Sequence, residues 1–156
     1  MLRALQTGLI DSVQVVFNII DQSAMDVLFP TCHRLGVAVI ARVPFDEGSL
    51  TGTLTPDSRW PEGDWRNVYF RPPHLAATLE RVAAIERLAT AQGLSLPEVA
   101  LRFILAQPEV TTTIPGMRRL RHVEANMAAA DAPPLDSELL DQLRAFRWDR
   151  TPDDRP

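Results

Sequence analysis

The chain alternates between short apolar runs and longer stretches in which apolar residues recur every three or four positions. The run 13–17 is mostly β-branched and the run 37–41 is continuously apolar, and both patterns are typical of buried strands in a parallel sheet. A third run, 110–114, is also β-branched and predicts another strand. Because helical patterns separate these runs, the sequence predicts an α/β fold with a parallel sheet and right-handed crossovers.

The helical stretches carry start and stop signals. Ser23 is expected to cap the helix after the first strand, and Gly36 to end it. Ser95 and Glu98 form a capping box at the start of a later helix, and Asp136 is expected to cap the last one. Apolar residues at helical spacing predict two further helices, one through Leu75, Leu79, Val82 and Leu88 and one through Leu120, Val123 and Met127.

The segment from Val43 to Pro73 has no clear period. Proline, glycine, aspartate and threonine interrupt it, and it contains Trp60, Trp65 and Tyr69. A loop of this length in a compact domain is usually functional or ordered by other parts of the protein. Its aromatic side chains either close over a substrate or pack as a local cluster, and the second arrangement is the commoner one.

Composition limits the classes of function. The 156 residues are 46% apolar and 23% charged, which suits one hydrophobic core and excludes wholesale disorder. The net charge of -4 argues against a nucleic-acid partner, and no apolar run approaches the ~20 residues of a membrane span. The start of the chain shows no signal-peptide pattern, and we expect a cytoplasmic protein.

Cysteine and lysine usage excludes further chemistry. The single cysteine, Cys32, allows neither an internal disulfide nor a cysteine metal cluster, and we expect no metal site. The basic residues are 16 arginines with no lysine, so no mechanism that uses a lysine ammonium operates within this chain.

Three stretches together resemble a known family. They are GLIDSVQVVFN at 8–18, VIARVPFDEGSLTG at 39–52, and TIPGMR at 113–118 followed by EAN at 124–126. In this order and spacing they resemble the C-terminal half of a bacterial aldo-keto reductase. The resemblance implies an incomplete (β/α)8 barrel formed by strands six to eight, with the ligand at the C-terminal ends of the strands. We expect a partial barrel domain over 1–148 and a flexible tail over 149–156.

The resemblance assigns cofactor contacts to the first two stretches. Gln14 would hold the nicotinamide carboxamide, although on residues alone a buried glutamine would rather bond to backbone groups. Arg42 stands where many members carry an aromatic ring that stacks on the nicotinamide, and Val43 replaces a common serine. The remaining matches resemble the family's loop around the pyrophosphate, in which backbone N–H groups matter most. On residues alone they would be an ordinary turn. They are Pro44, Phe45, Gly48 and Leu50.

The third stretch resembles the family's site for the 2′-phosphate of NADP. A helix N-terminus with guanidinium groups beside it attracts anions, although arginines in such a place are often only a solvated face. The resemblance implies that Arg118 is the main ligand of the phosphate and that His122 is a second one. It also implies that Asn126 contacts the adenine, whereas Ala125 replaces the acidic residue that is usual at this position. The strand-end residues Ile114, Pro115 and Gly116 complete the segment.

The family's catalytic tyrosine, lysine, aspartate and histidine belong to its N-terminal half. We expect this chain to lack that half, because it has no lysine and its only tyrosine, Tyr69, lies in another segment. No catalytic residue is therefore predicted. The sequence indicates the cofactor-binding half of an NADP(H)-dependent reductase, whose complete form transfers hydride to a carbonyl substrate. The alternatives are a non-catalytic NADP-binding module and one half of a split reductase, which an N-terminal half or self-association would complete through the open sheet edges.

Overall fold

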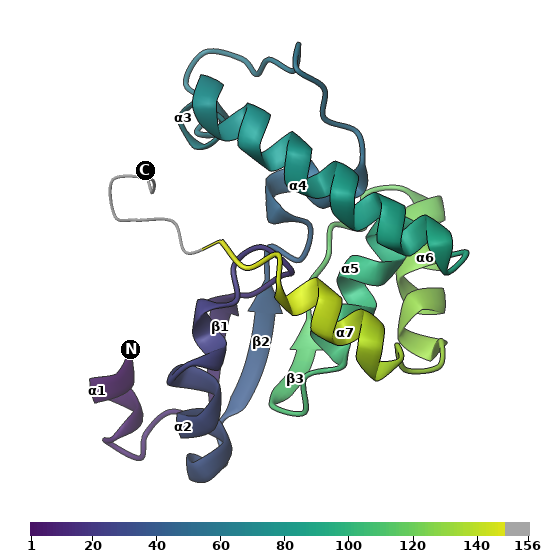
Figure 1. Cartoon of the computed structure of the whole chain (residues 1–156). Helices are drawn as coiled ribbons and strands as arrows, with labels where there is room; N and C mark the ends of the chain where they lie inside the picture. Colours follow the sequence, from purple (N-terminus) through teal and green to yellow (C-terminus); the bar gives the residue numbers. More distant parts are fainter. Residues whose placement is uncertain (149–156) are drawn as a thin grey trace.

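The computed structural model describes residues 1–148, and the predicted tail at 149–156 lies outside them. Its centre is a parallel sheet in the order β1 (Ser12–Val16), β2 (Ala38–Arg42), β3 (Val110–Thr113) (Figure 1). Gln14 pairs with Ile40, and Ala41 pairs with Thr113. The predicted parallel α/β arrangement is confirmed, with each strand within a residue of its expected position.

Helices precede, connect and follow the strands. Gly36 ends α2 with a φ of 66°, a left-handed conformation that glycine adopts without strain. Asp136 Oδ1 accepts a hydrogen bond from the Leu139 N–H at 2.7 Å, so the predicted cap is confirmed. The elements outside the sheet are α1 (Leu2–Leu5), η1 (Ser23–Met25), α2 (Leu28–Leu35), η2 (Asp46–Thr51), α3 (Arg66–Tyr69), α4 (Pro72–Ala91), α5 (Leu96–Leu105), α6 (Leu120–Asp131) and α7 (Ser137–Arg144).

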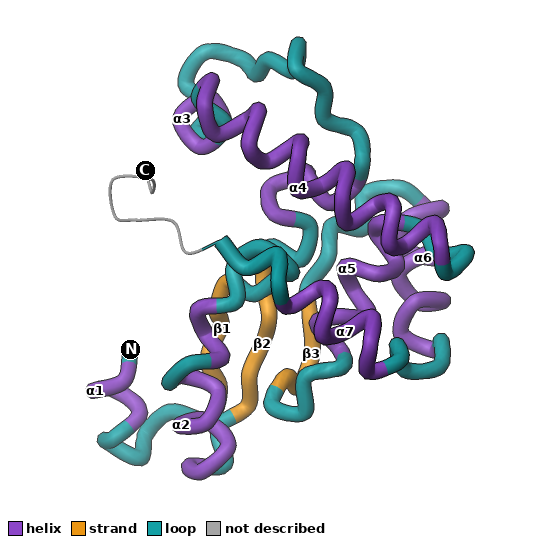
Figure 2. Tube along the Cα trace, viewed as in Figure 1, coloured by secondary structure: helices purple, strands orange, loops and turns teal. Residues whose placement is uncertain are grey.

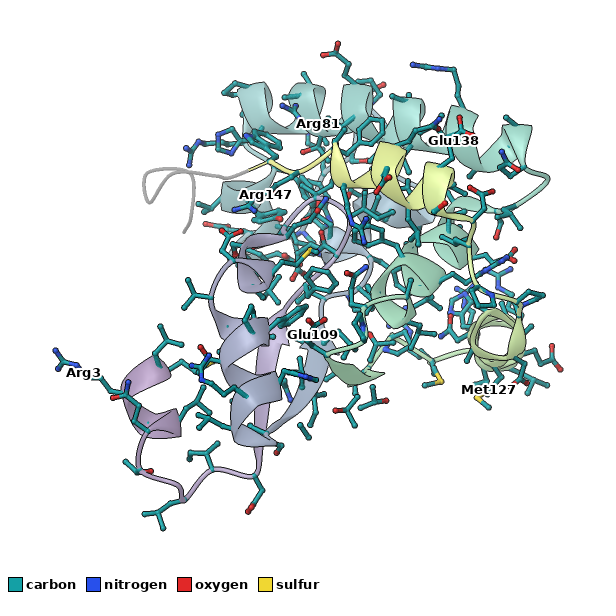
Figure 3. All side chains as sticks on the ribbon, turned by 60° about the horizontal axis from the view of Figure 1, so that its bottom comes forward. Arg3, Arg81, Glu109, Met127, Glu138 and Arg147 are labelled. Atoms are coloured by element: carbon teal, nitrogen blue, oxygen red, sulfur yellow. The ribbon has the colours of Figure 1, made fainter. Side chains whose placement is uncertain are left out.

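One helix prediction was wrong in detail. Ser23 does not cap the helix: it begins the short 3-10 turn η1, and α2 starts five residues later at Leu28. The helix predicted through Leu120, Val123 and Met127 is confirmed as α6, and its apolar residues are largely exposed, with Leu120 73% and Met127 55% accessible. Figure 3 shows Met127 at the outer edge of the molecule. The side chain of α6 that is buried is Ala129, a small residue that allows a close approach to α5.

One face of the sheet carries the core. Val13, Val39 and Ala41 are buried in a cluster with side chains from α2, α5 and α7. On the alternate positions Gln14 and Arg42 are exposed. Parallel sheets are usually covered on both faces. Within residues 1–148, this sheet is covered on one face.

The long segment after β2 becomes ordered through its aromatic residues. It passes from η2 in a loop over α4 and ends in α3 (Figure 2). Trp60 stacks on Phe70 with ring centroids 5.2 Å apart, and Trp65 packs on Tyr69 at 4.8 Å. Asp64 pairs with Arg66 at 2.7 Å. The aromatic residues therefore form a local cluster, one of the two arrangements that the sequence allowed.

The segment after α7 crosses the carboxyl ends of the strands (Figure 1). The Trp148 N–H donates to the Ile20 carbonyl at 2.9 Å, and the Arg81 guanidinium lies 4.2 Å from the centroid of the Trp148 ring. Arg147 forms two hydrogen bonds with the Asp26 carboxylate, at 2.6 and 2.7 Å. The end of the described chain is thus attached to the turn that follows β1.

Candidate functional site

A pocket of about 570 Å³ lies at the carboxyl ends of β1 and β2. Gln14, Arg42 and Val43, three residues predicted to contact a cofactor, all line it. The expectation that the Gln14 side chain is buried was wrong, because the face of the sheet that carries it is uncovered. Its amide is therefore accessible from this cavity, which we call the strand-end pocket.

Sequence reasoning missed part of the pocket lining. Glu47, Trp65 and Tyr69 also line the strand-end pocket. Burial raises the pKa of the Glu47 carboxyl, and the neighbouring Asp46 carboxylate raises it further. The acidic pair at 46–47 inside an otherwise family-like loop was the available signal for Glu47. No local pattern places Tyr69 there.

The loop after β2 has an unusual backbone. Val43, Asp46 and Glu47 have φ values of 55°, 45° and 56°, in the left-handed region that favours glycine. The N–H groups of Gly48 and Leu50 both donate to the Phe45 carbonyl, at 2.9 and 3.1 Å. Two backbone N–H groups of this region are therefore bonded to a carbonyl of the same loop.

The side chains that matched the family's pyrophosphate loop mostly face the protein. Pro44 and Leu50 are buried, and Phe45 is half-buried against the core. Gly48 adopts a φ of 104°, which only glycine takes readily. These positions shape the loop through packing and backbone conformation, and their contact with a cofactor stays a prediction.

The third stretch lies beside the second. The Ile114 N–H donates to the Ala41 carbonyl at 3.1 Å, which continues the β2–β3 pairing beyond β3. Pro115, Gly116 and Arg118 then lead to α6, whose N-terminus has no side-chain cap. Gly116 and Arg118 are exposed.

The first turns of α6 bring the remaining predicted residues to this segment. The Asn126 amide donates to the Gly116 carbonyl at 3.5 Å, and the Arg121 Nε donates to His122 Nε2 at 3.3 Å. A helix N-terminus with exposed guanidinium groups favours anions. The structure thus joins Asn126 to Gly116, with Arg118 just before α6 and His122 in its first turn.

A second cavity, of about 550 Å³, lies between the long loop and α4. Trp60, Phe70, Leu75 and Leu79 line it, with Arg59 among the polar residues. Residues 1–148 contain no group of three histidine, cysteine or acidic side chains placed to hold a metal ion. None of their helices is both long and apolar enough to cross a membrane.

Comparison with known proteins defines the class. The profile of the aldo/keto reductase family matches residues 4–147, and the chain belongs to this family. The NADH-specific methylglyoxal reductase of Escherichia coli (strain K12) is 28% identical over 135 residues, which are 86% of this chain and 41% of that protein. Aldo-keto reductase yakc of Schizosaccharomyces pombe, whose name specifies NADP(+), is 30% identical over 100 residues, or 63% of this chain and 29% of that protein.

A solved structure agrees in fold. Glycerol dehydrogenase AKR11B4 from Gluconobacter oxydans superposes with a TM-score of 0.78 at 23% identity, over 86% of this chain and 41% of that one. The chain therefore matches between 29% and 41% of the length of these relatives and corresponds to part of an aldo-keto reductase barrel. The family uses NADH or NADPH to reduce carbonyl compounds, and its members include enzymes specific for either cofactor.

Proposed function

We propose that this chain is the cofactor-binding part of an NADP(H)-dependent aldo-keto reductase, with β1, β2 and β3 corresponding to strands six to eight of the barrel. The observation that carries the proposal is the strand-end pocket, which Gln14 and Arg42 line from neighbouring strands at their carboxyl ends. Ligands of such barrels bind at this end of the strands. The Ile114–Arg118 segment continues the same edge through its bond to Ala41.

The residues present suit a dinucleotide. The Gln14 amide offers a donor and an acceptor, which match the carboxamide of a nicotinamide. The planar guanidinium of Arg42 is able to stack on a flat ring. Arg118, at the N-terminus of α6, supplies charged donors for a phosphate. When bound, the cofactor supplies the hydride for carbonyl reduction.

The chain by itself is proposed to bind the cofactor without reducing a carbonyl. Proton donation in the family depends on a tyrosine beside a lysine, and the chain contains no lysine. Its one tyrosine, Tyr69, directs its hydroxyl to the buried Asp46 carboxylate. Incubation of the purified chain with NADPH and a panel of aldehydes should give no NADPH oxidation, and turnover would contradict this part of the proposal.

A titration with and without Arg118 tests cofactor binding. We expect Arg118→Ala to weaken NADPH binding by about 10-fold to 100-fold, since a hydrogen bond to a charged group contributes ~1.5–3 kcal/mol. NADH binding should not change, because NADH lacks the 2′-phosphate. Arg3→Ala is the matched control, since Arg3 is exposed on α1 and points away from the molecule (Figure 3). Absence of NADPH binding to the unaltered chain would overturn the proposal.

The uncovered sheet favours a second candidate, one half of a split reductase. Among residues 1–148, β1 and β3 each pair on one side only, and the face that carries Gln14 is open. Exposed strand edges promote pairing with further strands. We expect the isolated chain to self-associate, or to bind a polypeptide that supplies the other barrel strands. If the isolated chain is a stable monomer in light scattering without any added polypeptide, this candidate is contradicted.

A further inference from the structure

The loop 43–48 holds a conformation that its residues do not favour. Val43, Asp46 and Glu47 all lie in the left-handed region, and Val43 is β-branched, for which this region is an outlier. Left-handed residues other than glycine persist only where the surroundings hold them. The structure contains two sets of contacts that do this, one at each end of the loop.

The first contact comes from Asn18, which is buried just beyond β1. Its Nδ2 donates to the Val43 carbonyl at 3.0 Å. Its Oδ1 accepts from the N–H groups of Ile20 and Asp21, at 2.9 and 2.8 Å. Because both ends of the amide are bonded, the side chain has one orientation and fixes the start of the loop to the end of β1.

The second contact comes from α3. Asp46 is buried, and its carboxylate accepts from the Ser49 hydroxyl at 2.8 Å and from the Tyr69 hydroxyl. Tyr69 lies 23 positions further along the chain and packs on Trp65. The pair therefore joins the loop to the aromatic cluster, and both Tyr69 and Trp65 line the strand-end pocket.

We propose that Asn18 and the Tyr69–Asp46 pair are positioning residues, which hold loop 43–48 in the strained shape that borders the strand-end pocket. Glu47 of this loop lines the pocket together with Arg42, which ends β2, so the shape of the loop determines where the Glu47 carboxyl meets a ligand. This inference rests on the proposed function for the identity of the ligand, NADPH. The shape of the loop itself is open to measurement without any ligand.

Two variants remove single contacts and keep the side-chain volume. Tyr69→Phe retains the ring and loses the hydroxyl, whereas Asn18→Asp retains the acceptor oxygen and, as a carboxylate, replaces the donor to Val43 with an oxygen that repels the Val43 carbonyl. Each should weaken NADPH binding by about tenfold in protein that is still folded by circular dichroism. The control is Thr7→Val, which removes a hydroxyl bonded to the Ala4 carbonyl, because Thr7 and Ala4 do not line the pocket.

A rescue separates positioning from general stability. Val43→Gly removes the steric cost of a φ of 55°. Combined with Asn18→Asp, it should restore most of the lost NADPH affinity although the missing hydrogen bond is not replaced. A merely structural role predicts no rescue, and that outcome would overturn the positioning role of Asn18.

Hydrogen exchange tests the same idea without NADPH. The amides of Gly48 and Leu50 donate to the Phe45 carbonyl, so their exchange reports the loop conformation. Both should exchange faster in Tyr69→Phe and Asn18→Asp, while the amides of β2 keep their rates. Unchanged exchange at Gly48 and Leu50 would overturn the inference. Faster exchange in a chain that binds no NADPH would support the inference and reject the proposed function.

Discussion

Phe17 offers a test of how aromatic packing in the core contributes to stability. It follows β1 directly, is fully buried, and contacts the rings of Phe29 and Phe103 at centroid distances of 4.9 and 5.9 Å. Phe17→Leu removes both aromatic pairs, each of which contributes about 0.5–1.5 kcal/mol beyond its buried area. With the cost of the space left behind, we expect the free energy of unfolding to fall by about 2–4 kcal/mol.

Phe70→Leu is the matched control. Phe70 is also buried and also contacts two aromatic rings, those of Trp60 and Tyr69, at 5.2 and 4.8 Å. It lies outside the main core cluster, beside the cavity under the long loop. Urea unfolding followed by circular dichroism should therefore show a smaller loss than that of Phe17→Leu, because the cost of empty space in the main core is absent. Equal losses would refute the reasoning, because the aromatic pairs alone would then account for the stability.

Three further predictions concern single ionisable groups. Because the pKa of Glu47 is raised, the folded chain binds the proton of this carboxyl more tightly than the unfolded chain does. The free energy of unfolding should therefore fall as the pH rises through and above the ordinary pKa of 4.5. Glu47→Gln should flatten this part of a profile of stability in urea against pH. Hydrogen bonds from Arg66 lower the pKa of Asp64 to about 2, so its stabilising contribution is present above pH 3.8 and lost as pH falls toward 2; Asp64→Asn should remove that acid dependence, and an unchanged profile would contradict it. Burial raises the pKa of the Cys32 thiol, so a thiol reagent should label it slowly at pH 8 and quickly in urea, whereas fast labelling of folded protein would contradict its burial.

Local chemistry predicted most of the elements. The β-branched runs placed all three strands, and the Ser95 hydroxyl accepts from the Glu98 N–H at 3.4 Å as its capping pattern requires. The position of Tyr69 in the strand-end pocket was not predictable, because it depends on the path of a long loop without periodicity. The exposure of Gln14 was missed for a related reason: an apolar strand pattern does not reveal which face of the sheet is covered.

The crossing of the C-terminal segment has a consequence for synthesis of the protein. The buried Gln22 amide donates to the carbonyls of Leu143 and Arg144 at 3.4 and 3.2 Å, and Trp148 bonds to Ile20. These contacts join residues about 120 positions apart, so the cost of closing the intervening chain must be met before they form. During synthesis on the ribosome, the turn after β1 is able to form its hydrogen bond with Trp148 only after residue 148 has emerged. This turn carries Asp21 and Ser23, which line the strand-end pocket, so that side of the pocket gains its last supporting contacts late in synthesis.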